Sequence, residues 1–177
     1  LLTNTAEDLG FANLSSLTTD DEAAAEQAVE YLIRRGHRNI GLLGGNLSCS
    51  QIGYQRMLGC WRSFRRHEIP FDEAVQCEQC RYSMDSAYAA TGRLLARFPD
   101  LTAIFAVSDV MAIGCIRALK DLGKRVPEDI SVVGYDGIPM ASYSVPRLTT
   151  IKQDAGSFAQ RGVDLLLEAI TQSKAPP

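Results

Sequence analysis

Residues 102–135 have the sequence TAIFAVSDVMAIGCIRALKDLGKRVPEDISVVGY. The two ends of this stretch, 102–107 and 130–135, are short runs rich in β-branched and aromatic side chains, which is typical of buried strands. Between them, apolar side chains recur at helical spacing, at Ala112, Cys115, Ile116 and Leu119. The stretch therefore predicts a strand, a helix and a second strand, and two strands joined in this way run parallel.

The same alternation extends toward the N-terminus. Further short apolar runs occur at 39–44 and 75–79, and helical patterns flank both of them. The apolar positions of these patterns are Ala25, Ala28, Val29 and Leu32, then Met57, Cys60, Trp61 and Phe64, then Ala87, Ala90 and Leu94. Strand and helix alternate four times, which predicts an α/β fold with a doubly wound parallel sheet.

The alternation of strand and helix patterns ends after residue 135. A loop rich in Pro, Ser and Gly at 136–146 precedes an extended segment, 148–152, and a final helix. We expect residues 15–147 to form one lobe and residues 148–177 to cross over to a neighbouring lobe. Residues 1–14 do not complete a strand–helix unit, so we assign them to the same neighbouring lobe.

The charge and hydropathy of the chain disfavour several classes of protein. With 18 Lys and Arg against 21 Asp and Glu, the net charge is −3, and no basic block suited to nucleic acid stands out. No apolar run approaches the ~18 residues of a membrane helix, and no basic segment followed by an apolar one marks an export signal. We expect a soluble, cytoplasmic chain that contacts no membrane and does not bind DNA by itself.

The five cysteines are an odd set, which favours free thiols in a reducing compartment. Cys77 and Cys80 have the spacing of a metal or redox pair, but we place both in a strand, where side chains three residues apart point to opposite faces. The chain has only two histidines, His37 and His67, and no glycine-rich phosphate-binding motif. We expect no metal, no cofactor and no catalytic residues.

Polar and aromatic segments follow the predicted strands. In open parallel sheets, ligands bind outside the carboxyl ends of the strands, which here are 44–50, 80–82, 108–109 and 136. Ser50 belongs to a polar loop that can reach a ligand, and Asp109 can cap the helix that it begins. The sequence predicts a ligand cleft at this edge, facing the neighbouring lobe.

Seven short segments, taken together, resemble the lactose-repressor (LacI/GalR) family. They are DDEAA (20–24), GHRNI (36–40), RMLG (56–59), TAIFA (102–106), SDVMAIG (108–114), VPEDISVVGYD (126–136) and LTTIKQ (148–153). The resemblance implies a two-lobed, hinged effector-binding domain with the fold of periplasmic sugar-binding proteins. It also implies a small-molecule effector, a homodimer, and operator DNA bound only through a helix-turn-helix segment that is not among these residues.

The resemblance suggests ligand-binding roles for further residues. Arg56 matches the family's Arg-x-x-Gly ligand arginine, and the alternative is an exposed helical arginine. Asp136 matches an aspartate that accepts hydrogen bonds from vicinal hydroxyls, and the alternative is a turn residue. Tyr82 lies where the family often has an aromatic ring against the effector. Ser108 departs from the family's usual Asn or Asp and offers a single hydroxyl.

These features favour the effector-sensing domain of a transcriptional repressor that binds a sugar or sugar derivative. A purine or a phosphorylated metabolite stays open as the effector. The alternative class is an extracytoplasmic sugar-binding protein of an ABC transporter, which the five cysteines and segment 126–136 disfavour. A sugar- or nucleotide-modifying enzyme on the same fold is the third possibility, because fold does not determine function.

The predicted site also carries an expectation about stability. Arg56 and Asp136 are expected at the edge of the sheet rather than beneath it, so truncating either one should leave folding nearly intact. Tyr135 is expected as a half-buried ring whose removal costs stability first.

Overall fold

The computed structural model describes residues 2–3, 15–44 and 51–171, and the chain divides into two compact units. The larger unit is Asp21–Lys152. The smaller unit comprises Leu1–Asp20 and Gln153–Pro177.

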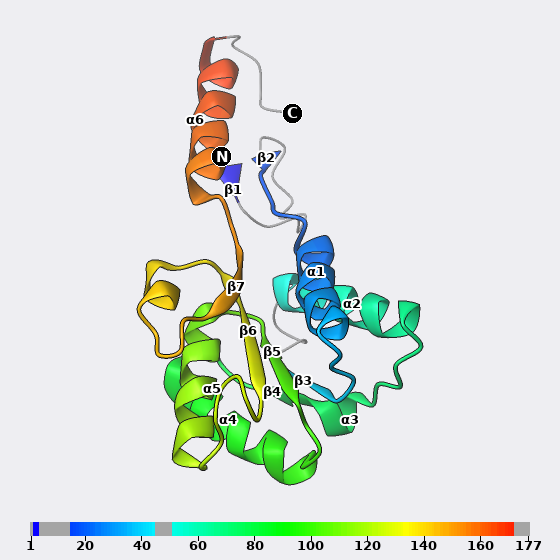
Figure 1. Ribbon diagram of the computed structural model, residues 1–177. Helices are drawn as coiled ribbons and strands as arrows, with labels where there is room; N and C mark the ends of the chain where they lie inside the picture. Colours follow the sequence, from blue (N-terminus) through cyan, green and yellow to red (C-terminus); the bar gives the residue numbers. More distant parts are fainter. Residues whose placement is uncertain (1, 4–14, 45–50, 172–177) are drawn as a thin grey trace. The chain divides into compact units, whose positions relative to one another are not determined.

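The larger unit is built on a five-stranded sheet in the order β4-β3-β5-β6-β7, and every neighbouring pair is parallel (Figure 1). The strands are β3 (Ile40–Gly44), β4 (Cys77–Gln79), β5 (Ala103–Ala106), β6 (Ser131–Asp136) and β7 (Thr149–Lys152). All residues of β3 and β5 are buried, as their apolar sequences predict for strands covered on both faces. The predicted fold class is confirmed.

Two pairs of helices cover the sheet. Helices α1 (Asp21–Arg34) and α2 (Gln51–Arg66) lie over one face, and α4 (Met84–Arg97) and α5 (Asp109–Asp121) lie over the other (Figure 1). The apolar positions expected at helical spacing point into the core, where Leu32, Met57, Phe64, Leu94 and Leu119 are buried. Among the described residues, no helix has the length and apolar character needed to cross a bilayer.

The sheet departs from the sequence expectation at two strands. Segment 149–152, expected as a crossover, pairs along β6 as a fifth strand, with Val133 opposite Thr149 and Asp136 opposite Lys152. Strand β4 begins at Cys77 rather than at residue 75, because a short helix, α3 (Glu73–Gln76), precedes it. The Asp72 side chain accepts a hydrogen bond from the Ala74 N–H and so starts this helix.

The described residues of the smaller unit form three elements. Strand β1 (Leu2–Thr3) pairs in parallel with β2 (Ser15–Ser16), and α6 (Ala155–Thr171) is a long helix. Helix α6 exposes Val163, Leu166, Leu167 and Ile170. Their spacing is that of a single apolar helix face.

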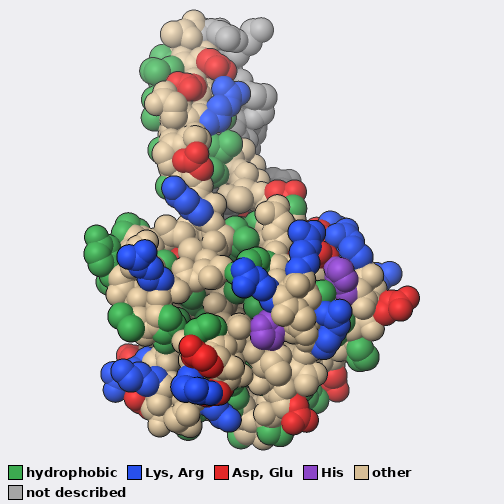
Figure 2. Space-filling view, viewed as in Figure 1, with side chains coloured by type: hydrophobic (Ala, Val, Ile, Leu, Met, Phe, Trp, Pro, Cys, Tyr) green, Lys and Arg blue, Asp and Glu red, His purple; other side chains and the backbone are tan. Residues whose placement is uncertain are grey.

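Ion pairs join α1 to α2 along their outer surface. Glu22, Glu26 and Glu30 lie one helical turn apart on α1, and Arg62 and Arg66 of α2 reach across to them. The Arg66 Nη1 lies 2.6 Å from the Glu26 Oε1. Basic side chains gather over this part of the larger unit in Figure 2.

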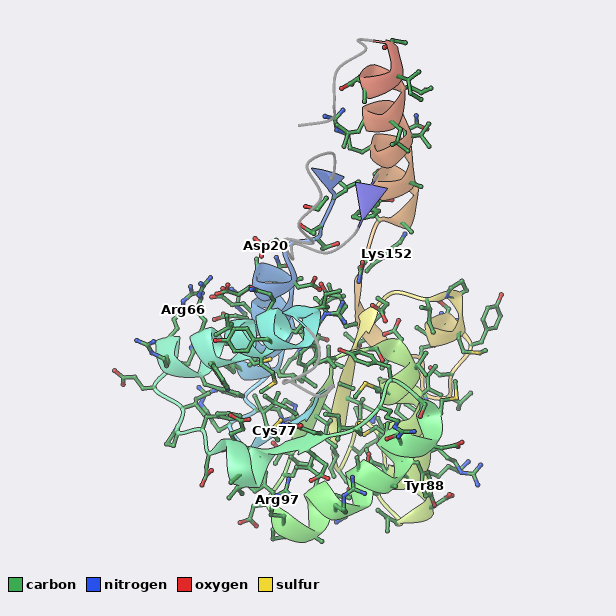
Figure 3. The ribbon with its side chains drawn as sticks, turned by 180° about the vertical axis from the view of Figure 1, so that it is seen from behind. Asp20, Arg66, Cys77, Tyr88, Arg97 and Lys152 are labelled. Carbon is green, nitrogen blue, oxygen red and sulfur yellow. The ribbon has the colours of Figure 1, made fainter. Side chains whose placement is uncertain are left out.

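Edge strand β4 is held by arginines from α4. The Arg97 Nη2 donates to the Cys77 carbonyl at 2.8 Å, and its Nη1 lies 2.8 Å from the Glu78 carboxylate; both residues of the first contact are labelled in Figure 3.

Burial raises the pKa of Cys77 to about 12 and that of Cys80 to about 11. Both side chains are therefore thiols near neutral pH, whereas metal binding and disulfide exchange require the thiolate. Cys80 lies just beyond β4, so the expectation that both cysteines share a strand is wrong.

Two glycines of the motifs above, Gly59 and Gly114, lie where paired helices approach each other closely. A Cβ atom at Gly59 of α2 would overlap the carbonyl oxygen of Glu22 in α1. A Cβ atom at Gly114 of α5 would overlap the carbonyl oxygen of Met84 at the start of α4. The backbones can approach this closely only where the side chain is a hydrogen atom.

Gly59→Ala and Gly114→Ala should each lower the free energy of unfolding by about 1–3 kcal/mol, because a backbone must shift to admit the methyl group. The matched control is Gly92→Ala within α4, where the added methyl meets no atom within 4 Å. This control should stabilise the chain by about 0.5–1 kcal/mol, since alanine suits a helix better than glycine. Urea denaturation measures all three, and equal effects would contradict the close helix contact.

Candidate ligand-binding site

The strand order places a topological switch point at the carboxyl edge of the sheet, between β3 and β5. The chain leaves β3 to form β4 on one side and then returns to form β5 on the other side of β3. The connections that follow β3 and β5 therefore run to opposite sides, and ligands of open α/β sheets bind at such a switch point. Val107 and Ser108 follow β5 at this place, and the loop that follows β3 lies outside the described residues.

Arg56 of α2 occupies the switch point. The residue is only 6 % exposed. Its Nε donates to Asp21 Oδ1 at 2.8 Å, and its Nη1 donates to the carbonyl of Val107. The alternative of an exposed helical arginine is therefore wrong, because the guanidinium lies against the residue that follows β5, against β6 and against the start of α1.

Tyr135 lies directly beneath this guanidinium. The Arg56 Cζ is 3.7 Å from the centroid of the Tyr135 ring, which is the geometry of a cation–π contact. The Tyr135 hydroxyl donates to Asp21 Oδ1 at 2.9 Å, so one carboxylate oxygen accepts from both residues. Burial, followed by the hydrogen bond and charge of Asp21, raises the pKa of Tyr135. The ring is fully buried, and the expectation of a half-buried ring is wrong.

Asp136 ends β6 beside Arg56. Its Oδ1 lies 3.9 Å from the Arg56 Nη2, and about a third of its side chain is exposed (31 %). The backbone of Asp136 has φ 116°, a conformation that L-residues adopt only when the surroundings enforce it. Gly137 follows with φ 71°, and a Cβ atom there would lie 2.7 Å from the Lys152 Cα. The close approach of β7 therefore requires glycine after Asp136.

Asp109 stabilises the same bend by hydrogen bonds. Its carboxylate is fully buried and accepts hydrogen bonds from the Ile138 N–H, at 2.8 Å, and from the Thr150 hydroxyl. The structural role expected for Asp109 thus takes a different form, because it is not the cap of α5. Ser108 is that cap, and its hydroxyl accepts from the Met111 N–H at 3.3 Å.

Tyr82 lies in the connection between β4 and α4, and 45 % of it is exposed. Burial of its hydroxyl raises the Tyr82 pKa; Arg56 lowers that pKa, and Asp136 and Asp21 raise it. Tyr82 follows the carboxyl end of β4, at the same edge of the sheet as Asp136 at the end of β6. The structure thus brings Arg56 and Asp136 together, and Tyr82 offers an exposed ring at that edge.

The other two predicted site residues have different outcomes. Ser108 is 4 % exposed, and its capping bond leaves the hydroxyl hydrogen as its donor toward a ligand. Ser50 lies outside the described residues. The ligand-binding role of each stays a prediction.

Two members of this cluster were not predicted as site residues from the sequence. Asp21 was noted only as part of segment 20–24, and Tyr135 only as a ring on a strand. The available signal was the acidic pair Asp20 and Asp21 directly before an amphipathic helix. That signal does not reveal that the Asp21 carboxylate meets residues 35 and 114 positions away in the chain.

The histidines lie away from the cluster. His37 bridges the hydroxyls of Thr102 and Ser131, at 3.0 and 3.1 Å, where the amino ends of β3, β5 and β6 meet. His67 Nε2 lies 2.8 Å from the Glu30 carboxylate. Among the described residues, no group of three or more His, Cys, Asp or Glu could hold a metal ion.

The chain resembles known regulators over almost its whole length. Residues 29–177 match the family described as periplasmic binding protein-like domain, and the chain belongs to this family, as an effector-binding domain of the LacI/GalR type. The probable HTH-type transcriptional repressor ExuR of Bacillus subtilis (strain 168) is 33 % identical over 165 residues, which cover 93 % of this chain and 49 % of ExuR. The HTH-type transcriptional regulator MalR of Clostridium butyricum is 36 % identical over 169 residues, covering 95 % of this chain and 50 % of MalR.

Solved structures agree with these relatives. The transcriptional regulator CelR in complex with cellobiose superposes with a TM-score of 0.89 at 31 % identity, over 99 % of this chain and 54 % of that chain. A LacI-family regulatory protein from Chloroflexus aggregans has a TM-score of 0.88 at 28 % identity, over 99 % of this chain and 62 % of that chain. The chain spans about half the length of the relatives that it matches.

Arg56→Ala should destabilise the protein by about 3–5 kcal/mol, which revises the expectation that its truncation leaves folding intact. The reason is that the Asp21 carboxylate, whose side chain is 11 % exposed, would lose its cation while still shielded from water. The control is Arg117→Ala, which breaks an i,i+4 pair at a side chain that is 70 % exposed and should leave the melting temperature unchanged. Thermal unfolding with equal melting temperatures for both variants would refute the buried ion pair.

Proposed function

We propose that the chain is the effector-sensing domain of a bacterial transcriptional repressor. The observation that carries this proposal is the buried Arg56 beside Asp136 at the switch point of the sheet, with the exposed ring of Tyr82 in the connection that follows β4. The relatives are named as transcriptional repressors and regulators, which supports a regulator over the binding protein of a sugar transporter. These names also support a chain without catalytic activity.

The proposed effector is a sugar or sugar derivative. Asp136 can accept hydrogen bonds from vicinal hydroxyls, Arg56 can donate to ring or hydroxyl oxygens, and the exposed ring of Tyr82 can cover an apolar sugar face. Ser108 and Ser50 are proposed as further polar contacts. Similar structures include a regulator with cellobiose and a LacI-family regulator from Enterococcus faecium with bound ribose.

The proposed signal is a change in the arrangement of two lobes. Residues 15–147 would form one lobe, and residues 1–14 and 148–177 would belong to the other. Operator DNA would be bound by a helix-turn-helix segment outside these residues, in the cytoplasm. A ligand that prefers one lobe arrangement tenfold shifts that equilibrium by about 1.4 kcal/mol.

The intact protein is proposed to be a homodimer that associates through both lobes. Around the 3-10 helix η1 (Pro139–Ser142), Met140 is 54 % exposed, Tyr143 81 % and Val145 89 %. Figure 2 shows hydrophobic side chains gathered over this segment, at the left of the larger unit. Large apolar side chains in such a cluster are typical of a protein contact.

A thermal-shift screen tests the effector. We expect at least one sugar of a panel that includes cellobiose and ribose to raise the melting temperature of the parent chain. Asp136→Ala should weaken that binding by about ten- to a hundredfold, because a hydrogen bond to a charged group is lost. Asp129→Ala removes a carboxylate close to the other end of β6 and should bind like the parent. A sugar that binds Asp136→Ala as tightly as the parent would contradict the assignment of Asp136 to the ligand-binding site.

Sedimentation tests the dimer in the intact protein. The parent should be dimeric at micromolar concentration, and replacing Tyr143 and Val145 together by serine should produce monomers, because it removes the most exposed apolar side chains of the cluster. Tyr54→Ser, which replaces a 44 % exposed ring on α2, should stay dimeric. A parent protein that sediments only as a monomer would count against the proposed contact.

A further inference from the structure

We infer that Asp21 and Tyr135 are positioning residues that hold the Arg56 guanidinium in one orientation toward the ligand. This inference rests on the proposed function in one respect, which is that Arg56 meets the effector. The contacts that fix the guanidinium are all made by residues of the chain, so they can be tested separately from binding.

Three elements restrain the guanidinium from three directions. Asp21, the first residue of α1, accepts from the Nε at 2.8 Å, and the carbonyl of Val107 after β5 accepts from the Nη1. The centroid of the Tyr135 ring, which belongs to β6, lies 3.7 Å from the Cζ of Arg56. Together these contacts fix both the direction of the side chain and the rotation of its plane.

Asp21 is itself held in place. The Tyr135 hydroxyl donates to the same Oδ1 that accepts from Arg56, at 2.9 Å. The carboxylate also lies at the N-terminus of α1, where the helix dipole favours a negative charge. Tyr135 therefore acts twice, by its ring on Arg56 and by its hydroxyl on Asp21.

This division of contacts determines which donors are left for a ligand. The Nε is directed at Asp21, and one N–H of Nη1 is directed at Val107, so the remaining N–H groups belong to Nη1 and Nη2. The Nη2 faces Asp136, which lies 3.9 Å away. A ligand atom that accepts from Arg56 must therefore approach along the end of the guanidinium, next to the Asp136 carboxylate.

Pre-orientation should raise affinity because a free arginine side chain loses many rotamers when it binds a ligand. In this site the Arg56 side chain already loses those rotamers when the protein folds. Removing Asp21 should let the side chain sample other rotamers, whereas an amide at the same position can still accept from both the Nε and the Tyr135 hydroxyl. Asp21→Asn is therefore the conservative variant that keeps the geometry and removes the charge.

Nuclear magnetic resonance of the ligand-free full chain tests the positioning role. The Arg56 Nε–H signal, assigned by its loss in Arg56→Lys, should exchange slowly with water and be shifted by the current of the Tyr135 ring. Asp21→Ala should speed this exchange by about tenfold or more, because the hydrogen bond that protects the proton is lost. The exchange rate in Asp21→Asn should lie between those of the parent and of Asp21→Ala. Tyr135→Phe should keep the ring-current shift, while its Arg56 Nε–H exchanges faster than in the parent.

The matched control is Glu26→Ala. Glu26 is a carboxylate on the same helix, its side chain is 12 % exposed against 11 % for Asp21, and it also pairs with an arginine of α2. This variant should lose stability without altering the Arg56 signal. If Asp21→Ala and Tyr135→Phe both leave the Arg56 exchange rate at the parent value, the two residues only stabilise the fold and the inference is overturned. Should Asp21→Ala fail to fold, Tyr135→Phe decides the same question.

Binding of cellobiose or ribose gives the second readout. Asp21→Ala should weaken the binding of whichever sugar the parent binds by about tenfold, and Asp21→Asn should restore most of it. A sugar that binds Asp21→Ala as tightly as the parent would overturn the inference. If the parent binds no sugar, the proposed function fails, while the exchange rates of the ligand-free chain still decide the positioning role.

Discussion

The parallel direction of all five strands is the constraint on which the site depends. It brings every carboxyl end to one edge of the sheet, so residues from the ends of β5 and β6 meet the N-terminal halves of α1 and α2 there. The strand order then sends the connections after β3 and β5 to opposite sides, and ligands of open α/β sheets bind at such a point. Arg56 is buried there, and Asp136 and Tyr82 are partly exposed.

A buried guanidinium is costly unless its charge and its donors are satisfied. The Asp21 carboxylate, the Val107 carbonyl and the face of Tyr135 together satisfy them. The same groups that make burial of Arg56 tolerable also restrict its orientation. With the ligand-binding role proposed for Arg56, a substitution of this residue is expected to change both stability and effector binding.

Arg56 was suggested from the sequence by the resemblance of segment 56–59 to the family's Arg-x-x-Gly. The structure shows why a glycine suits position 59, since α1 and α2 lie in close contact there. Other features were not accessible. That Ser108 rather than Asp109 caps α5, and that the Asp109 carboxylate turns to Ile138 and Thr150, depends on segments that are distant in the chain.

The alternation of apolar runs and helical spacing was enough to establish the parallel α/β class, because periodicity follows directly from the geometry of strands and helices. It could not establish that residues 149–152 join the sheet as a fifth strand, since an extended segment gains its partners only when β6 presents a free edge. Nor could it establish the burial of Arg56 and Tyr135. Burial of a polar group depends on partners brought together by the tertiary fold, and Asp21 reaches both residues only after the sheet and its helices have assembled.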